Sequence, residues 1–280
     1  MNNFELLPFA SADELVSRAA SVWLDEIESA IRAGKMHSVA FSGGRTAEKF
    51  FAAAVELAKT RKIGDGGTPS LPANVHFFWA DERCVPPNNP ESNFKLANDV
   101  LFEPLKMSAN QIHRIHGEDL PEAAAKVANE EIRRVLPISS PSPRRGEGGG
   151  EEANFTNPLT PTLSPLGRGE GEMSLPVLDL VFLGMGEDGH VASLFPGEIE
   201  AAVSDPAIYR AVRNSPKPPS KRISMSYAAI AAAKQVWVLV SGAGKEAAFR
   251  ESLKPDGQTP LARVMRSRSR TTIFSDIPAG

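Results

Sequence analysis

The sequence is poor in several features that mark particular classes of protein. Its 280 residues include one cysteine, Cys84, which excludes an intrachain disulfide and a cysteine metal cluster. The most apolar stretch, 177–185, contains Asp179 and is far shorter than the roughly 20 residues that cross a bilayer as a helix. The amino-terminal residues lack the basic start and long apolar run of a signal peptide. We therefore expect a cytoplasmic protein with no membrane contact.

A large excess of charge of one sign is also missing. The 31 basic and 34 acidic residues give a formal net charge of −3. The chain as a whole therefore exerts no attraction on nucleic acid or anionic lipid, and we expect neither as a partner. An anionic ligand would need a local basic pocket. The apolar fraction of 41% is ordinary for a globular protein, and a chain of this length can bury a large core.

The segment 137–172 differs in composition from the rest of the chain. It holds six prolines and seven glycines in 36 positions, and the motif at 142–148 is nearly repeated at 164–171. Such a composition buries too little apolar surface to offset chain entropy. We interpret it as a flexible, low-complexity insertion at about 137–174 within a single α/β domain spanning 1–280. A partner-binding loop is the alternative.

Outside this segment, apolar strands alternate with amphipathic helices. The strand candidates are 37–41, 74–79, 111–115, 177–183, 207–212, 222–226 and 235–241. Helices are expected at 12–33, after Thr46, at 92–101, at 121–136, after Ser226 and after Gly242. Ser11 and Glu14 form a predicted capping box at the start of the first helix. This alternation predicts an α/β fold with a Rossmann-like, open, mostly parallel sheet and helices on both faces. In such sheets ligands bind at the carboxyl ends of the strands.

The first candidate site, Ser42-Gly-Gly-Arg-Thr46, lies between a predicted strand and a predicted helix. Gly43 and Gly44 let the backbone approach a ligand closely. The hydroxyls of Ser42 and Thr46, the Arg45 guanidinium and the helix N-terminus all suit a phosphate monoester. An ordinary turn in which Thr46 caps the helix explains the same residues equally well.

Two charged segments are further candidates. Asp81-Glu-Arg83 follows an apolar strand, where charged side chains often face a cleft. A surface ion pair together with a helix cap at Ser92 explains it as well. Lys217 and Arg222 lie in and after a proline-rich loop and would suit closure over a phosphate, with a solvated basic loop as the alternative.

The fourth candidate is the glycine-rich run Gly184-Met-Gly-Glu-Asp-Gly-His190 after an apolar strand. Gly186 and Gly189 let the chain turn sharply, which brings His190 to the end of the strand. An imidazole, with an ordinary pKa of about 6.5, suits general-base catalysis. A solvent-exposed histidine is the alternative, but the glycine-rich context favours function. The other four histidines show no metal-ligand spacing, and we expect no metal site.

In chain order, the motifs SGGRT, FFWADERCVP with ESN, LDLVFLGMGEDGHVASLFPG and KPPSKRISMS resemble those of the 6-phosphogluconolactonase family. This family shares a superfamily with the glucosamine-6-phosphate isomerases. The most specific motif, at 184–197, continues after the histidine as VASLFPG, whereas the related deaminases have a phrase close to GHIAFNEP. Ala47 stands where the family often has proline, and the 137–172 segment is no part of the pattern.

The resemblance implies the sugar-phosphate isomerase/lactonase type of α/β fold. It also implies hydrolysis of 6-phospho-D-glucono-1,5-lactone to 6-phospho-D-gluconate, in the oxidative branch of the pentose phosphate pathway, without metal or organic cofactor. His190 would act as the base, with Asp81 or Asp188 orienting the imidazole or the substrate hydroxyls. Backbone N–H groups of the glycine turns, or Arg83, would stabilise the carbonyl oxygen. The residues expected to hold the small sugar-phosphate substrate are Ser42, Gly43, Gly44, Arg45, Thr46, Arg83, Gly186, Gly189, Lys217 and Arg222.

Two alternatives remain at this point. One is a glucosamine-6-phosphate deaminase-like sugar-phosphate isomerase, and the other is a non-catalytic sugar-phosphate-binding domain like those of some transcriptional regulators. We expect a monomer or a weak dimer. The lactonase hypothesis requires that His190 and the pair Gly43–Gly44 line one pocket.

Overall fold

The computed structural model describes residues 3–63, 70–136 and 175–278. The segment interpreted as a flexible insertion at about 137–174 lies outside these residues, so that interpretation stays a prediction. None of the helices within the described ranges is long and apolar enough to cross a membrane.

The strands are β1 (Phe4–Pro8), β2 (His37–Phe41), β3 (Val75–Trp79), β4 (Asp81–Arg83), β5 (Leu180–Gly184), β6 (Tyr209–Val212), β7 (Arg222–Met225), β8 (Gln235–Val240) and β9 (Thr271–Ser275). The α-helices are α1 (Ala12–Arg32), α2 (Arg45–Arg61), α3 (Asn93–Ala97), α4 (Pro121–Val135), α5 (Glu200–Val203), α6 (Tyr227–Ala232), α7 (Glu246–Leu253) and α8 (Pro260–Arg266). A π-helical turn η1 (Asn98–Phe102) and a 3-10 turn η2 (Ala109–Gln111) complete the described elements.

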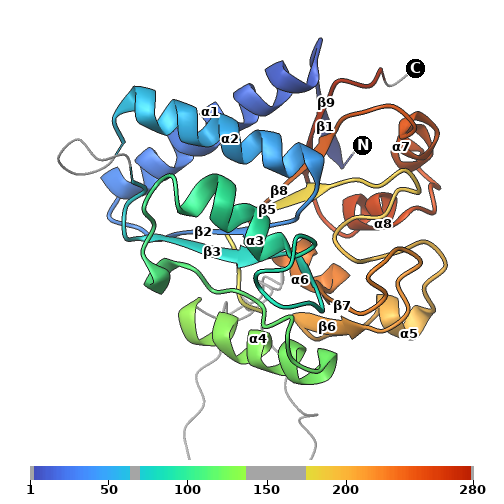
Figure 1. The fold of residues 1–280 in the computed structure, drawn as a ribbon. Coiled ribbons are helices and arrows are strands. Elements are labelled where there is room, and N and C mark those ends of the chain that lie inside the picture. The colour runs from blue at the N-terminus through green and yellow to red at the C-terminus, as the bar shows by residue number, and fades with distance from the viewer. Residues whose placement is uncertain (1–2, 64–69, 137–174, 279–280) are drawn as a thin grey trace, which may run out of the picture.

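Six of these strands form one parallel sheet in the order β1-β9-β8-β5-β2-β3. In Figure 1, α1 and α2 lie on one side of this sheet, and α4 and α6 lie on the other. Central strands such as β2 are buried along their whole length, as expected for strands covered on both faces. The predicted α/β class with a mostly parallel sheet is therefore confirmed.

A second sheet of three antiparallel strands, in the order β4-β7-β6, was not expected from the sequence. Ala80 joins the two sheets, because its N–H donates to Phe41 O (2.8 Å) and its carbonyl accepts from Met225 N (2.7 Å). The strand candidates at 207–212 and 222–226 therefore belong to this small sheet and not to the parallel one. It brings β4 and β7 to the carboxyl end of β3.

The strand predicted at 111–115 is wrong. Only one bridge forms there, between Phe77 and Ile112, next to a hydrogen bond from His113 N to Phe77 O (2.9 Å). Gln111 explains this, because its side-chain amide donates to Pro72 O (2.7 Å) and Val75 O (2.9 Å) and so pins a 3-10 turn in place of a strand. The elements β1, α8 and β9 were not singled out in the sequence at all.

The predicted capping box of α1 forms in a shifted version. Ser11 Oγ accepts from Glu14 N (3.2 Å) as expected, but the Glu14 carboxylate accepts from Ala10 N (3.0 Å) and not from Ser11 N. The helix then buries Trp23, whose ring centroid lies 5.6 Å from the ring centroids of Phe41 and Phe50. This aromatic packing, together with Phe182 at 4.3 Å from Phe50, fixes β2 and α2 relative to β5. The turn between β2 and α2 is therefore held on a rigid base.

Candidate active site

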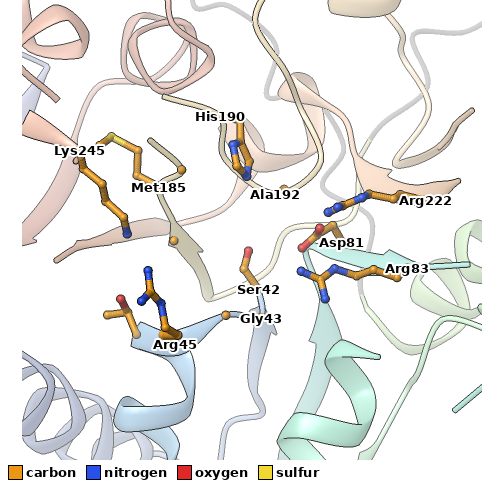
Figure 2. A pocket seen from close by; sticks show the side chains of 14 residues that line it. Ser42, Gly43, Arg45, Asp81, Arg83, Met185, His190, Ala192, Arg222 and Lys245 are labelled. Atoms are coloured by element: carbon orange, nitrogen blue, oxygen red, sulfur yellow. The ribbon is translucent and has the colours of Figure 1, made fainter. Parts of the chain in front are cut away.

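An open cavity of about 150 Å³ lies at the carboxyl ends of β2, β3 and β5 (Figure 2). It is lined by Ser42, Gly43, Gly44, Arg45, Thr46, Asp81, Arg83, Gly184, Met185, Gly186, His190, Ala192, Arg222 and Lys245. In Figure 2, Arg45 and Lys245 lie on one side of it and Asp81, Arg83 and Arg222 on the other. His190 and the Gly43–Gly44 pair thus share one pocket, as the sequence-based hypothesis requires.

In the turn at residues 42–46, Ser42 N donates to Phe182 O (3.1 Å), but the N–H groups of 43–46 have no partner among the described residues. Gly44 is the N-cap of α2 and has φ 98°, a conformation that favours glycine, and no side chain of the described residues caps the helix. The first N–H paired back along the helix is that of Glu48, to Gly44 O at 3.0 Å. Thr46 therefore does not cap α2, so the ordinary-turn alternative fails in this detail. The free N–H groups and the helix dipole both favour an anion here.

Position 43 requires glycine because the backbone there lies very close to the Asn93 side chain. A Cβ at this position would lie 1.9 Å from Asn93 Oδ1, so the loop backbone presses directly on the Asn93 amide. Ser42 Oγ, at the floor of the cavity, is buried and has no hydrogen-bond partner among the described residues. A buried hydroxyl without a partner is costly, which is typical of a site that a ligand completes.

His190 and Asp188 form a hydrogen-bonded pair at the rim of β5. His190 Nδ1 lies 2.5 Å from Asp188 Oδ1, and the imidazole packs 4.9 Å from the ring of Phe195. Gly186 faces the ring so closely that a Cβ there would lie 2.0 Å from His190 Nδ1. Of the two carboxylates considered from the sequence, Asp188 is thus the one that contacts the imidazole.

The electrostatic surroundings keep this histidine neutral and its partner ionised. Burial lowers the pKa of His190, against the raising effect of Asp188. Burial pushes the pKa of Asp188 upward, but the hydrogen bonds with His190 and the charge of Lys217, 3.6 Å away, outweigh it and hold that pKa below the usual value. A proton on Nδ1 facing Asp188 leaves Nε2 with a free lone pair, the form that a general base needs.

The backbone donors of the glycine-rich turn are occupied within the turn itself. Gly186 N donates to His190 O (2.9 Å), and Gly189 N donates to Gly186 O (3.0 Å). Neither of these two N–H groups is free for a carbonyl oxygen. Gly189 and Asp188 do not themselves line the cavity; they shape the turn that presents His190.

The three residues of the segment Asp81-Glu-Arg83 take separate roles. Asp81 and Arg83 line the cavity, and Arg83 Nη1 is anchored on Glu91 O at 2.6 Å. Glu82 turns away from the cavity and caps α3, because its carboxylate accepts from Asn93 N (2.8 Å) and Phe94 N (2.8 Å). Burial raises the pKa of Glu82, which these hydrogen bonds partly offset.

Arg222 is committed mainly to the loop that precedes its strand. Its Nε donates to Pro219 O (3.0 Å), and its Nη2 donates to Pro218 O (3.0 Å) and Lys217 O (3.2 Å). The Lys217 ammonium does not line the cavity and approaches Asp188. The two cations expected to hold a phosphate together thus lie in different surroundings, one anchoring a loop at the cavity wall and one beside the His190–Asp188 pair.

Lys245, at the start of α7, lines the cavity but was missed in the sequence. Burial lowers the pKa of Lys245, and the neighbouring Arg45 guanidinium adds to the effect. A usable signal was present, since Ser241-Gly-Ala-Gly-Lys245 follows the apolar strand β8 and, like Ser42-Gly-Gly-Arg45, leads from a serine through glycines to a cation. Within the described residues, no group of three or more His, Cys, Asp or Glu side chains could hold a metal ion.

Comparisons with known proteins agree on one family. Residues 10–274 match the family model described as glucosamine-6-phosphate isomerases/6-phosphogluconolactonase. The chain is 34% identical over 172 residues, 61% of its length, to a 6-phosphogluconolactonase of Treponema pallidum. It is 33% identical over 207 residues, 74% of its length, to 6-phosphogluconolactonase 3, chloroplastic, of Arabidopsis thaliana. These matches span 57% and 55% of the two relatives' own lengths.

The fold is also found among solved structures. The crystal structure of a devB protein superposes with a TM-score of 0.71 at 28% identity, covering 98% of this chain and 97% of that one. The family match over most of the chain, the shared architecture and the motifs at the cavity all point the same way. The chain belongs to the glucosamine-6-phosphate isomerase/6-phosphogluconolactonase family.

Proposed function

We propose that this chain hydrolyses 6-phospho-D-glucono-1,5-lactone to 6-phospho-D-gluconate. Relatives named 6-phosphogluconolactonase, which the chain matches over 55–57% of their lengths, support this choice within the family. The observation that carries the proposal is the placement of His190, paired with Asp188, in the same cavity as the free helix N-terminus at 43–47. The cavity thus combines a general base with an anion cradle.

The phosphate belongs at the side of the cavity formed by Arg45 and Lys245. There the unpaired N–H groups at the start of α2, the helix dipole and two cationic side chains converge on one anion. Lys245 is half-buried, so water screens its charge less than that of a fully exposed lysine. Anchoring the phosphate fixes the lactone ring relative to His190 and so lowers the entropic cost of reaction.

His190 then removes a proton from a water molecule next to the lactone carbonyl. Its Nε2 is the acceptor, since Nδ1 faces Asp188, and the carboxylate stabilises the imidazolium that forms. A positioned base of this kind accelerates such a step by about 10²–10⁴-fold. The same imidazolium returns the proton to the ring oxygen as the C1–O bond breaks.

The negative charge that develops on the carbonyl oxygen needs a donor within the cavity. Gly186 N and Gly189 N are occupied, and the free N–H groups at 43–47 are assigned to the phosphate, so we assign this role to the Arg83 guanidinium, which points into the cavity in Figure 2. Asp81 lies on the same side of the cavity and accepts hydrogen bonds from the sugar hydroxyls.

A direct assay with freshly generated lactone, corrected for spontaneous hydrolysis, tests the proposal. His190→Ala should lower kcat by at least about 10²-fold, while binding of 6-phosphogluconate stays similar because the anion cradle is untouched. His116→Ala removes a histidine that is 43% exposed and pairs with Asp119, and it serves as the matched control. Ammonia release from glucosamine 6-phosphate without lactonase turnover would show that the chain is a deaminase instead.

A further inference from the structure

The Asp81 carboxylate is fixed from two sides by neutral donors outside the anion cradle. Asn93 Nδ2 donates to Asp81 Oδ1 (3.2 Å) and to the Asp81 carbonyl (2.8 Å). Ser193 Oγ donates to Asp81 Oδ2 at 2.7 Å. Both donors are almost fully buried, with exposed fractions of 2% and 0%. The carboxylate therefore has one hydrogen bond on each oxygen and cannot rotate freely.

The backbone immediately before Ser193 is strained. The preceding residue, Ala192, lines the cavity and has φ 50°, a left-handed conformation that is unfavourable for a residue with a Cβ. Ser193 is held on its other side as well, because its N–H donates to Ser224 Oγ at 3.2 Å. Strain of this kind persists where the surroundings determine the conformation, and it is common at functional sites.

Asn93 connects the carboxylate to the anion cradle. It is the first residue of α3, and its N–H donates to Glu82 Oε1 at 2.8 Å. Its Oδ1 occupies the space next to Gly43 where a Cβ would lie only 1.9 Å away. The loop at 42–44 and the Asp81 carboxylate thus pack on opposite parts of one amide group.

We propose that Asn93 and Ser193 are positioning residues that lock the Asp81 carboxylate toward the sugar hydroxyls. The inference rests on the proposed function. Because Arg45 and Lys245 lie across the cavity from Asp81 (Figure 2), loosening Asp81 leaves the phosphate anchored but lets the lactone ring turn away from His190. Misalignment of this kind lowers kcat more than it weakens binding.

The chain offers a closely matched control for Ser193. Ser38, at the amino end of β2, is also a buried serine, with an exposed fraction of 1%, and its hydroxyl donates to Asp179 Oδ2 at 2.8 Å. Ser38→Ala therefore removes the same type of hydrogen bond at the opposite end of the sheet. We expect both variants to lower the unfolding temperature by similar amounts.

Only Ser193→Ala should lower kcat, by about ten- to a hundredfold, with KM and the affinity for 6-phosphogluconate nearly unchanged. The near-isosteric Ser193→Cys, a weak donor, should show the same split and covers the case in which the alanine variant does not fold. Equal kcat for the Ser193 and Ser38 variants, or a rise in KM alone, would overturn the positioning role.

A double-mutant cycle separates action through Asp81 from a general structural effect. Once Asp81→Ala has removed the carboxylate, adding Ser193→Ala should cause no further loss of kcat, whereas independent effects would multiply. An unmodified chain without lactonase turnover refutes the proposed function itself. An active unmodified chain with multiplying effects refutes only the role of Ser193.

Discussion

Gly186→Ala is a sharp steric perturbation of the His190–Asp188 pair, which we propose is catalytic. The added Cβ would lie 2.0 Å from both Cε1 and Nδ1 of His190 and 2.8 Å from Asp188 Oδ1. The substitution adds no charge and removes no hydrogen-bonding group. Any effect on turnover therefore reports the position of the imidazole.

The magnitude follows from the space available. To restore an ordinary contact of 3.4 Å, the ring or the glycine turn must retreat by about 1.4 Å. A misplacement of about 1 Å can cost on the order of 10²-fold in rate, so we expect kcat to fall by at least that factor. Overpacking of a turn costs about 1–3 kcal/mol, which leaves the fold intact in a domain of ordinary stability.

The measurement is lactone hydrolysis together with the affinity for 6-phosphogluconate. The turn at 42–46, which we propose binds the phosphate, is untouched, so product affinity should change little. Gly34→Ala is the control, since Gly34 has φ 62°, precedes the amino end of β2, opposite the carboxyl end that borders the cavity, and has no atom of the described residues within 4 Å of an added Cβ. It should lose stability without losing kcat. A folded Gly186→Ala variant with normal kcat would show that His190 is not the base.

Three further predictions concern charge. Because burial lowers the pKa of His190, the acid limb of the kcat/KM profile should have its midpoint below 6.5. The stability of the fold should also fall as the pH decreases below about 6.5, because the unfolded state then binds a proton that the folded state does not. Lys217→Gln should move that limb upward, since the Lys217 charge lowers the pKa of His190 while Asp188 and Asp81 raise it; a pH–rate profile with an unmoved limb would contradict this. Arg45→Ala and Lys245→Met should each raise KM for the phosphorylated lactone by about tenfold or more with little change in kcat. Lys59→Met removes a partly exposed cation paired with Glu56 on α2 and should change neither KM nor kcat. Normal KM values for Arg45→Ala and Lys245→Met would show that the phosphate does not bind on this side of the cavity.

Local patterns in the sequence predicted most of the elements and the motifs, although they missed β1, α8 and β9 and wrongly indicated a strand at 111–115. An apolar run marks the strand 37–41, glycine spacing marks the turns around Gly44 and His190, and a local contact of Ser11 Oγ with Glu14 N opens the first helix. Such interactions can be inferred from spacing and side-chain chemistry. The order of the motifs along the chain also identified the family resemblance that the comparisons confirm.

Tertiary structure decided how these pieces are combined. The contact of Ser193 with Asp81 joins positions 112 residues apart, and no local pattern in the chain indicates it. Such packing also determined that Asp188 and not Asp81 meets the imidazole, and that Lys245 enters the cavity. The same packing places the Glu82 carboxylate where it caps α3. Each outcome depends on which strand ends meet at one edge of the sheet, and strand order is set by the burial of the whole core and not by any single segment.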